Sequence, residues 1–261
     1  MIQLIHERLD KITRLIDSNG MVNASRLAKE FGVSIETIRR DLEYLESKGS
    51  LKRVYGGAIA NVSKGIERDY TRRETLNIDE KSAIAQKTAE FIKDGDTIAM
   101  DLGTTMLEVA KYLGGKKDLT VITNSLPVGM ELVKNKNTRV FMLGGDLRFG
   151  DFSTSGFLSC AGLSNFRVDK AIIGASGITV KNGVTDYHVE EANVRRKMID
   201  ISEQVIAVAD HTKFGISTFI QVCKLSNVDI IVTDYKVSDS VVSVFSGLST
   251  KLVVASSPNE Q

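Results

Sequence analysis

The chain has 261 residues, of which 42% are hydrophobic and 26% are charged, a mixture that is typical of globular proteins and argues against long disordered regions. Lys and Arg number 34 against 33 Asp and Glu, and the resulting net charge of +1 excludes a globally basic protein that coats nucleic acid. A small DNA-binding module remains compatible with this balance, because only local charge matters at a DNA groove.

Residues 1–57 have the periodicity of short amphipathic helices. Apolar residues recur at steps of three and four from Ile2 to Ile16, which predicts a first helix. Asn23 and Ser34 each precede a further apolar-periodic run, so we expect each of them to cap a helix. The second and third helices, with the turn between them, form a helix–turn–helix pattern over about residues 20–39.

The outward side of the third helix and the hairpin after it carry residue types that contact DNA. In helix–turn–helix proteins the second helix of the motif enters the major groove, and its arginines and hydroxyls suit base or phosphate contacts. A basic hairpin suits a wing on the DNA backbone. The candidate DNA-binding residues are Ser34, Glu36, Thr37, Arg39 and Arg40 on the helix, and Lys52, Arg53 and Tyr55 on the hairpin. An amphipathic helical cap with a solvated charged face is the alternative interpretation.

Residues 58–76 have few large apolar side chains and no clear period, which indicates a linker. After it, short apolar runs alternate with helix-compatible segments, which predicts a parallel α/β sheet covered on both faces. We therefore expect a larger α/β domain over residues 77–255. The expected strands are 97–100, 119–123, 139–143, 171–173, 205–209, 230–233 and 252–255, and the expected helices are 79–93, 104–113, 126–134 and 190–201.

Glycine and small polar clusters follow several of these strands. In a parallel sheet, ligands gather outside the carboxyl ends of the strands. Residues 101–105 lead from a strand into a helix, where free backbone N–H groups and the helix dipole favour an anion such as phosphate. Taken alone, this run also fits an ordinary capped helix. Similar clusters occur at 121–125, 144–148, 173–177, 183–186 and 210–215, and we expect them to converge on one polar pocket.

Several other classes of site and location are excluded by the sequence. It has no Walker motif and no G-x-G-x-x-G fingerprint, and its three histidines lack metal-ligand spacing with Cys160 and Cys223. We therefore expect no metal and no cofactor, and we expect the two cysteines to be reduced thiols. The first residues do not resemble a signal peptide, and no apolar run reaches the roughly 18 residues of a membrane-spanning helix, so we expect a cytoplasmic protein.

The run LAKEFGVSIETIRRDLEYLESKGSLKRVYGGA, residues 27–58, resembles the winged helix–turn–helix of DeoR-family bacterial transcription regulators. Its TIRRDL core, basic wing and final GGA carry the likeness, although the family usually has histidine where this chain has Tyr55. The stretches DLGTT, TNS, LGGDLR, IIGASGI, EEANVRRKMI and DHTKFG resemble the effector-sensing domain of the same family. Together the resemblance covers about residues 1–235.

This resemblance implies a fold shared with ribose-5-phosphate isomerase and glucosamine-6-phosphate deaminase, in a domain that senses a phosphorylated sugar. It implies a phosphate loop and an adjacent wall at Asp101, Gly103, Thr104, Thr105, Asn124 and Ser125. It implies close approach of the backbone to the ligand at Gly145, Gly174, Ala175 and Gly177. It also implies contacts with sugar hydroxyls or phosphate from Asp186, Glu190 and Lys213.

The function implied is a DNA-binding transcriptional regulator, a repressor of a carbohydrate-metabolism operon whose operator binding responds to a phosphorylated sugar. The expected partners are double-stranded operator DNA and this effector, with no membrane. We expect a homo-oligomer, either a dimer or a tetramer, because dimers match two half-sites. The alternative is a sugar-phosphate isomerase or deaminase-like enzyme fused to a DNA-binding module, for which Asp101, Asp186 and Glu190 offer carboxylates. The fusion favours a sensor, so we assign no catalytic residue.

Overall fold

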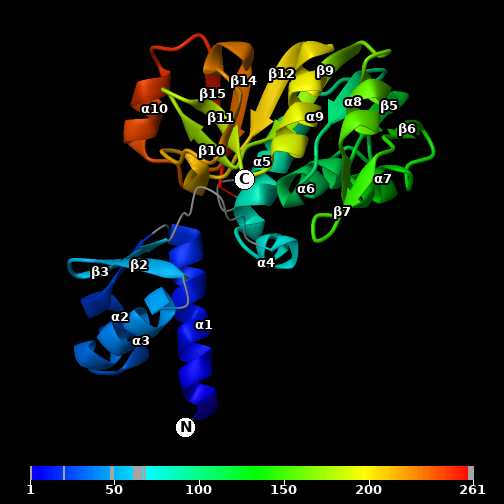
Figure 1. Cartoon of the computed structure of the whole chain (residues 1–261). Helices are drawn as coiled ribbons and strands as arrows, with labels where there is room; N and C mark the ends of the chain where they lie inside the picture. Colours follow the sequence, from blue (N-terminus) through cyan, green and yellow to red (C-terminus); the bar gives the residue numbers. More distant parts are fainter. Residues whose placement is uncertain (1, 20, 48–49, 61–66, 68, 258–261) are drawn as a thin grey trace. The chain divides into compact units, whose positions relative to one another are not determined.

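The computed structural model divides the chain into two compact units, Met1–Ser63 and Lys64–Gln261, which we call the amino-terminal unit and the carboxy-terminal unit (Figure 1). It describes residues 2–19, 21–47, 50–60, 67 and 69–257. Among the helices of this described part, none is long and apolar enough to cross a membrane.

The amino-terminal unit contains three helices and a small antiparallel sheet of strand order β1-β3-β2. Its elements are α1 (Ile2–Asn19), β1 (Met21–Asn23), α2 (Ala24–Phe31), α3 (Ile35–Ser47), β2 (Leu51–Val54) and β3 (Gly57–Ala60). The three predicted helices are confirmed. The Asn23 side chain accepts hydrogen bonds from the backbone of Ser25 and Arg26 at 2.9 and 3.1 Å, and Ser34 Oγ accepts one from Thr37 at 3.1 Å. Both predicted helix caps are therefore confirmed.

The core of this unit joins the inward faces of all three helices. Ile12, Ile38 and Leu42 are fully buried in one cluster, which matches the predicted apolar spacing. Arg8 on α1 and Asp41 on α3 add a bidentate ion pair at 2.7 and 3.1 Å. The third strand, β1, was not expected, because three residues are too short for a visible alternation.

The carboxy-terminal unit is built on a seven-stranded sheet of order β15-β14-β12-β9-β4-β5-β6. All of its strand pairs are parallel, which confirms the predicted α/β class. Its strands are β4 (Thr97–Met100), β5 (Leu119–Thr123), β6 (Thr138–Met142), β9 (Val168–Gly174), β12 (Ser202–Val208), β14 (Ile230–Thr233) and β15 (Lys251–Val254). Each corresponds to one of the seven apolar runs that were expected to form strands.

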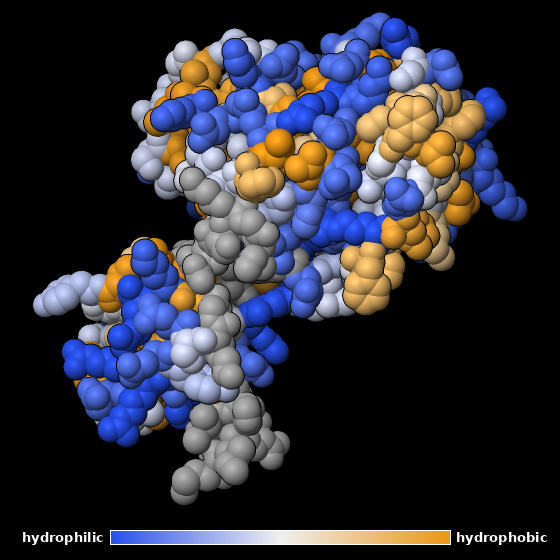
Figure 2. All heavy atoms as spheres, in the orientation of Figure 1, coloured by the Kyte–Doolittle hydropathy of each residue, from blue (hydrophilic) through white to orange (hydrophobic). Residues whose placement is uncertain are grey.

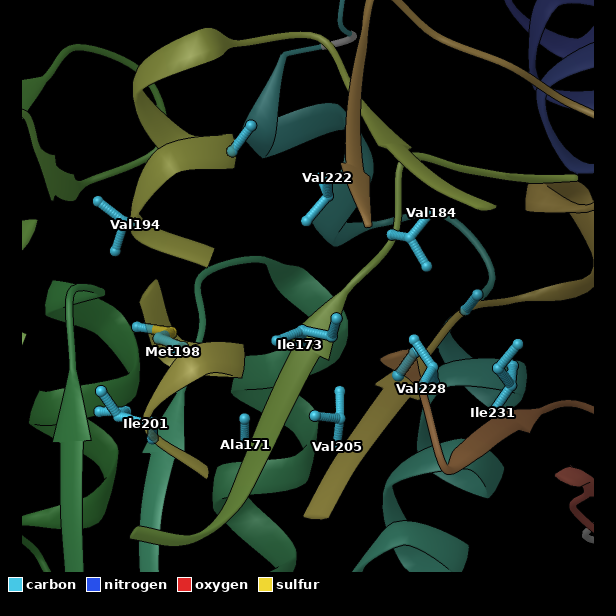
Figure 3. Close-up of a cluster of buried hydrophobic side chains, with 14 of the residues drawn as sticks. Ala171, Ile173, Val184, Val194, Met198, Ile201, Val205, Val222, Val228 and Ile231 are labelled. Carbon is cyan, nitrogen blue, oxygen red and sulfur yellow. The ribbon is translucent and has the colours of Figure 1, made fainter. Parts of the chain in front are cut away.

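Both faces of this sheet are buried, so its strands read as continuous apolar runs rather than alternating ones. On β9, Ala171 and Ile173 lie in one apolar cluster together with Met198 of α9 (Figure 3). Ile172 between them lies in the cluster on the other face, together with Met106 of α6. The helices of this unit are α4 (Tyr70–Glu74), α5 (Ile78–Ala89), α6 (Thr104–Tyr112), α7 (Leu126–Leu132), α8 (Phe157–Leu163), α9 (Val189–Asp200) and α10 (Asp239–Phe245).

Several short elements of this unit differ from the sequence-based expectation. The strands β7 (Asp146–Arg148) and β8 (Ser153–Ser155) form an antiparallel hairpin, and β10 (Gly177–Thr179), β11 (Gly183–Asp186) and β13 (Ile220–Cys223) form a small antiparallel sheet. They are three or four residues long, which is too short to carry much periodicity.

The segment expected to be a linker, 58–76, also contains regular structure. Residues 58–60 belong to β3, whose pairing with β2 extends to Ala60, and residues 70–74 form α4 with Tyr70 buried. Residues 61–66 and 68 lie outside the described residues. The wing hairpin therefore extends to Ala60, into the segment that was expected to be a linker. Gly57 cannot be replaced there, because a Cβ atom would lie 1.9 Å from the carbonyl oxygen of Val22.

Candidate functional site

The predicted DNA-binding residues lie on α3 and on the β2–β3 hairpin. Helix α3 buries Ile38, Leu42 and Leu45, so the residues between them face outward. Seven of the eight candidates are exposed and Thr37 is half-buried; the seven are Ser34, Glu36, Arg39, Arg40, Lys52, Arg53 and Tyr55.

Some of these exposed side chains form ion pairs within the protein and others do not. Arg39 lies 3.5 Å from Glu36, and Arg53 pairs with Glu46 at 2.9 Å. The backbone N–H of Arg53 also bonds Glu46 and holds the pKa of that carboxyl below its usual range. Arg40 and Lys52, by contrast, form no ion pair with any described residue. They are the cations of this surface that are free to contact a phosphate or a base edge.

In the carboxy-terminal unit, the loop after β4 leads into a helix that lacks a side-chain cap. Helix α6 begins at Thr104, and its N-cap is Gly103, with φ of +121° and no side chain to accept a hydrogen bond. A Cβ atom placed on Gly103 would meet no described atom within 4 Å, so space lies open beside it. Thr104 is buried and Thr105 half-buried in the first turn. The backbone N–H groups of this turn are left for an external acceptor.

Beside this loop, a buried arginine joins the ends of two strands. Arg195 on α9 is 3% exposed; its Nε donates to Asp101 at 2.5 Å, and its Nη1 donates to Asp186. The same oxygen of Asp101 accepts the backbone N–H of Gly174 at 2.9 Å. Burial alone would raise the pKa of Asp186, but the charge of Arg195 holds it below its ordinary value. The carboxyl ends of β4 and β9 and the end of β11 therefore meet at one place.

Two buried oxygen atoms at this edge have no hydrogen-bond partner among the described residues. They are Oδ1 of Asp101 and Oδ1 of Asn124, on the residues that directly follow the paired strands β4 and β5. The amide nitrogen of Asn124 donates to the carbonyl oxygen of Thr154 at 3.0 Å. Ser125 is also buried, and it caps α7 by accepting the N–H of Val128 at 3.4 Å. Ser125 thus serves the helix, whereas Asp101 and Asn124 keep an acceptor unused.

Two of the predicted ligand-binding glycines are required by the packing of the chain itself. A Cβ atom on Gly145 would lie 2.3 Å from the carbonyl oxygen of Ser155, and one on Gly177 would lie 2.5 Å from that of Ile216. At both positions the close approach is made by this protein's own backbone. Gly174 lies beside Asp101, and Ala175 packs against an apolar cluster.

The glutamate that faces the interior is Glu191, not the predicted Glu190. Glu190 is exposed, whereas Glu191 is 2% exposed and pairs with Arg148. Glu191 and Arg195 are four residues apart on α9 and therefore share its inward face. The i, i+4 spacing to an arginine was the signal in the sequence that could have selected Glu191.

Glu191 belongs to a group of charged side chains that the sequence analysis missed. We call this group the ion cluster; it consists of Glu67, Arg73, Arg148, Asp151, His188 and Glu191. Arg148 contacts Asp151 at 2.6 Å, His188 at 2.7 Å and Glu67 at 3.3 Å, besides Glu191. Arg73 contacts Asp151 and Glu67, the latter at 3.0 Å. Oxygen atoms of the three carboxylates lie within 4.8 Å of one another, and each of the two arginines contacts at least two of these carboxylates.

In the ion cluster, the pKa values of Glu191 and His188 lie above their ordinary values. Burial, followed by the charge of Asp186, raises the pKa of Glu191 to about 7. The hydrogen bond to Glu67 raises the pKa of His188.

The loop after β12 adds positive charge to the same unit. Lys213 is half-buried there and follows Asp210, which is buried. Lys81 on α5 is also buried, donates to the carbonyl oxygens of Leu76 and Arg73, and has a pKa that burial lowers to about 8. The charges of Asp210 and Lys213 both act on Lys81, which places these three groups near one another.

Comparisons with known proteins match both units. Residues 8–64 match the DeoR-like helix-turn-helix domain, and residues 76–235 match the DeoR C terminal sensor domain. The chain is 34% identical to the HTH-type transcriptional regulator GolR of Listeria innocua, over 94% of this chain and 98% of that protein. It is 34% identical to the glycerol-3-phosphate regulon repressor of Escherichia coli, over 91% and 94%. It is 36% identical to the HTH-type transcriptional repressor GlcR of Bacillus subtilis, over 87% and 88%.

Solved structures align with a smaller share of this chain than these sequence relatives do. Ribose 5 phosphate isomerase A from Neisseria gonorrhoeae covers 52% of this chain and 53% of its own, at 20% identity and a TM-score of 0.39. The α/β class stands on the parallel sheet described above.

Proposed function

The chain belongs to the DeoR family of transcriptional regulators, and on that premise we propose that it is a repressor of a carbohydrate-metabolism operon whose operator binding is modulated by a phosphorylated sugar. Relatives that carry names of this kind include the glycerol-3-phosphate regulon repressor and a putative aga operon transcriptional repressor of Escherichia coli. We further propose that it acts in the cytoplasm, as a homo-oligomer.

For DNA binding, the proposal assigns α3 to the major groove and the β2–β3 hairpin to the adjacent backbone. Arg40 and Lys52 support it, because both are exposed and neither is held by a carboxylate of the described residues. Arg53 is positioned by Glu46 at 2.9 Å, which fixes the direction in which the wing presents its guanidinium group.

For effector binding, the observation that carries the proposal is the uncapped start of α6. Its first-turn N–H groups open beside Gly103, and the positive end of the helix dipole favours the phosphate of a sugar. The carboxylate of Asp101 and the amide of Asn124 follow the neighbouring strands, and each keeps one acceptor oxygen without a partner. Such oxygens accept hydrogen bonds from hydroxyl groups. Candidate phosphate donors and unpartnered acceptor oxygens thus lie at one sheet edge.

A charge placed in the first turn of α6 tests this assignment. Thr105→Asp puts a carboxylate among the N–H groups where phosphate is expected, while an acidic residue in a first turn favours the helix itself. Gly103 is less suited to the test, because its φ of +121° would strain any side chain introduced there. We expect Thr105→Asp to bind operator with unchanged affinity and to lose its response to the effector.

The measurement is isothermal titration against a panel of sugar phosphates, run beside fluorescence anisotropy with operator DNA. We expect the effector dissociation constant to rise by at least about tenfold, which corresponds to ~1.4 kcal/mol. Ser240→Asp, in the first turn of α10, is the matched control and should respond like the wild type. Retained effector affinity in Thr105→Asp would place the phosphate elsewhere.

The proposal also implies that the carboxy-terminal unit has no catalytic activity. The relatives are named as transcriptional regulators, and the buried carboxylates of Asp101 and Asp186 are tied to Arg195. We expect no turnover of ribose-5-phosphate or glucosamine-6-phosphate in a coupled assay with purified protein. Turnover that disappears in Asp101→Asn would favour the enzyme alternative instead.

A further inference from the structure

The β7–β8 hairpin and the start of α8 expose five large apolar side chains. Figure 2 shows the apolar colouring gathered over the side of the carboxy-terminal unit where Figure 1 labels β7 and α8. We call this surface the hairpin patch; its residues and their exposed fractions are Leu147 (62%), Phe149 (101%), Phe152 (48%), Phe157 (84%) and Leu158 (66%). In Figure 2 hydrophilic residues lie between these apolar atoms; exposed apolar side chains grouped in this way on one side of a protein often mark an interaction surface.

The hairpin is held in place, so the patch is a defined surface rather than a loose loop. Arg148 and Asp151 point away from the patch into the ion cluster, where they pair with each other at 2.6 Å. The carbonyl oxygen of Phe152 accepts the N–H of Leu126 at 2.9 Å. The ring of Phe152 also packs edge-on against Tyr70, at 5.8 Å between centroids. With Arg148 and Asp151 turned inward and anchored, the hairpin presents its aromatic side chains to solvent.

The charge pattern of the patch fits a second copy of this chain. From Phe149 to Ser164 the sequence contains one charged residue, Asp151, which is buried; Asp146 on β7 is exposed, and its carboxylate lies beside Gly156. A two-fold interface brings the same surface of both copies together, so exposed charges near the axis would face like charges. With Asp146 as its exposed carboxylate, the hairpin and the start of α8 keep this repulsion small, and they offer a highly charged partner little to pair with.

The exposed apolar area of the patch is also close to what an interface between two copies needs. A phenylalanine ring buries roughly 150–250 Å² when it is covered, so the exposed parts of the three rings account for roughly 350–600 Å² per copy. A stable interface of standard size needs about 800 Å² from each partner. Leu147 and Leu158, both more than half exposed, bring the patch close to that requirement.

We propose that the hairpin patch is the surface through which two copies of this chain associate. The contact is isologous, with the aromatic rings of one copy packed against those of the other across a two-fold axis. This inference rests on the homo-oligomer of the proposed function and names its surface of assembly; it does not depend on which effector or operator is bound.

Analytical ultracentrifugation of the full chain tests the proposal without DNA or effector: a monomeric wild type would contradict the proposed homo-oligomer as well, whereas a folded Asp variant that stays assembled would contradict this surface alone. Phe149→Asp/Phe157→Asp places like charges opposite one another, and we expect the dissociation constant of the assembly to rise by at least about tenfold. Phe219→Asp changes an aromatic residue of comparable exposure, 66%, outside the patch and should keep the wild-type mass. Circular dichroism confirms that each variant is folded.

A mixing experiment separates loss of contact from any other effect of the substitutions. Phe149→Lys/Phe157→Lys should also dissociate alone, and an equal mixture of the Asp and Lys variants should regain the wild-type mass, because opposite charges then face each other. A folded Asp variant that keeps the wild-type mass, a wild type that is monomeric throughout the micromolar range, or a mixture that stays dissociated would each overturn the proposal.

Discussion

Glu190 and Glu191 are neighbours in the sequence, yet one faces solvent and the other is almost fully buried. The sequence analysis named Glu190 as a candidate for the effector site, which stays a prediction; the helical period relative to Arg195 places Glu191 on the inward face of α9. The partner of Glu191 had no such signal, because Arg148 lies 43 positions away and only the folded chain brings it near. Residue pairs within one helix are therefore predictable from sequence, and long-range ion pairs are not.

The raised pKa of Glu191, about 7 instead of 4.5, makes stability depend on pH. The folded state keeps a proton that the unfolded chain releases in this window, so stability falls as pH rises from about 5 to 7.5. His188, with a raised pKa, contributes in the same direction above pH 6.5. The charges facing Glu191 are those of Asp186, Arg148, Arg195 and Glu67.

We therefore expect Glu191→Gln to reduce this loss of stability by on the order of 1–3 kcal/mol. Urea unfolding of the full chain at several pH values measures it. Glu190→Gln alters the exposed neighbour and should reproduce the wild-type profile. Identical profiles for Glu191→Gln and the wild type would show that Glu191 titrates normally.

On the DNA-binding surface, Arg40 and Lys52 are expected to act differently. If Arg40 bonds a base edge, Arg40→Ala weakens operator binding by about 1–3 kcal/mol and relaxes specificity. Lys52→Ala removes a phosphate contact, so it should weaken all sequences alike and lower the salt slope by about one. Anisotropy titrations at several salt concentrations measure the operator affinity of both variants, and Lys11→Ala on α1 serves as the control. If both variants bind like Lys11→Ala, α3 and the wing do not contact DNA.

At the scale of elements, the strands of the large sheet were predictable and the short strands around it were not. A strand that is buried on both faces consists of consecutive apolar residues, and Ile230–Thr233 is identical in prediction and structure. The β7–β8 hairpin is stabilised by the ion cluster and by the bond from Leu126 to Phe152, none of which is local in sequence. In the candidate effector site, too, only the local feature was predictable. The start of α6 could be predicted from the sequence around it, whereas Arg195, which joins the strand ends, could not.

The ion pairs of Arg195 on α9 with Asp101 and Asp186 lead to a stability prediction. Arg195→Met leaves Asp101 and Asp186 as uncompensated buried charges, which should destabilise the carboxy-terminal unit by about 3–5 kcal/mol. Adding Asp101→Asn and Asp186→Asn should recover part of that loss, because the neutral amides no longer need a cation. Urea unfolding measures both variants beside Lys197→Met, a half-buried control on the same helix. A triple variant as unstable as Arg195→Met would assign the cost to lost packing.

At the scale of the whole molecule, the ion cluster links three parts of the carboxy-terminal unit that are far apart in sequence. Glu67 and Arg73 lie on the segment that follows the amino-terminal unit, Arg148 lies on the β7–β8 hairpin, and Glu191 begins α9. Helix α9 in turn holds Asp101 through Arg195, beside the uncapped start of α6. The proposed effector site is thus connected by direct contacts to the chain that leads toward the DNA-binding unit.

A connection of this kind has a thermodynamic consequence, since free-energy coupling between two sites is reciprocal. If the effector changes operator affinity by some factor, operator DNA must change effector affinity by that same factor. Arg148→Met removes the hub of the ion cluster without touching α3 or the start of α6, so we expect both factors to shrink together toward one while each ligand alone still binds. Titrating effector with and without operator, and operator with and without effector, gives the two numbers. Operator DNA would then act as a regulator of effector binding, as much as the effector regulates binding to DNA.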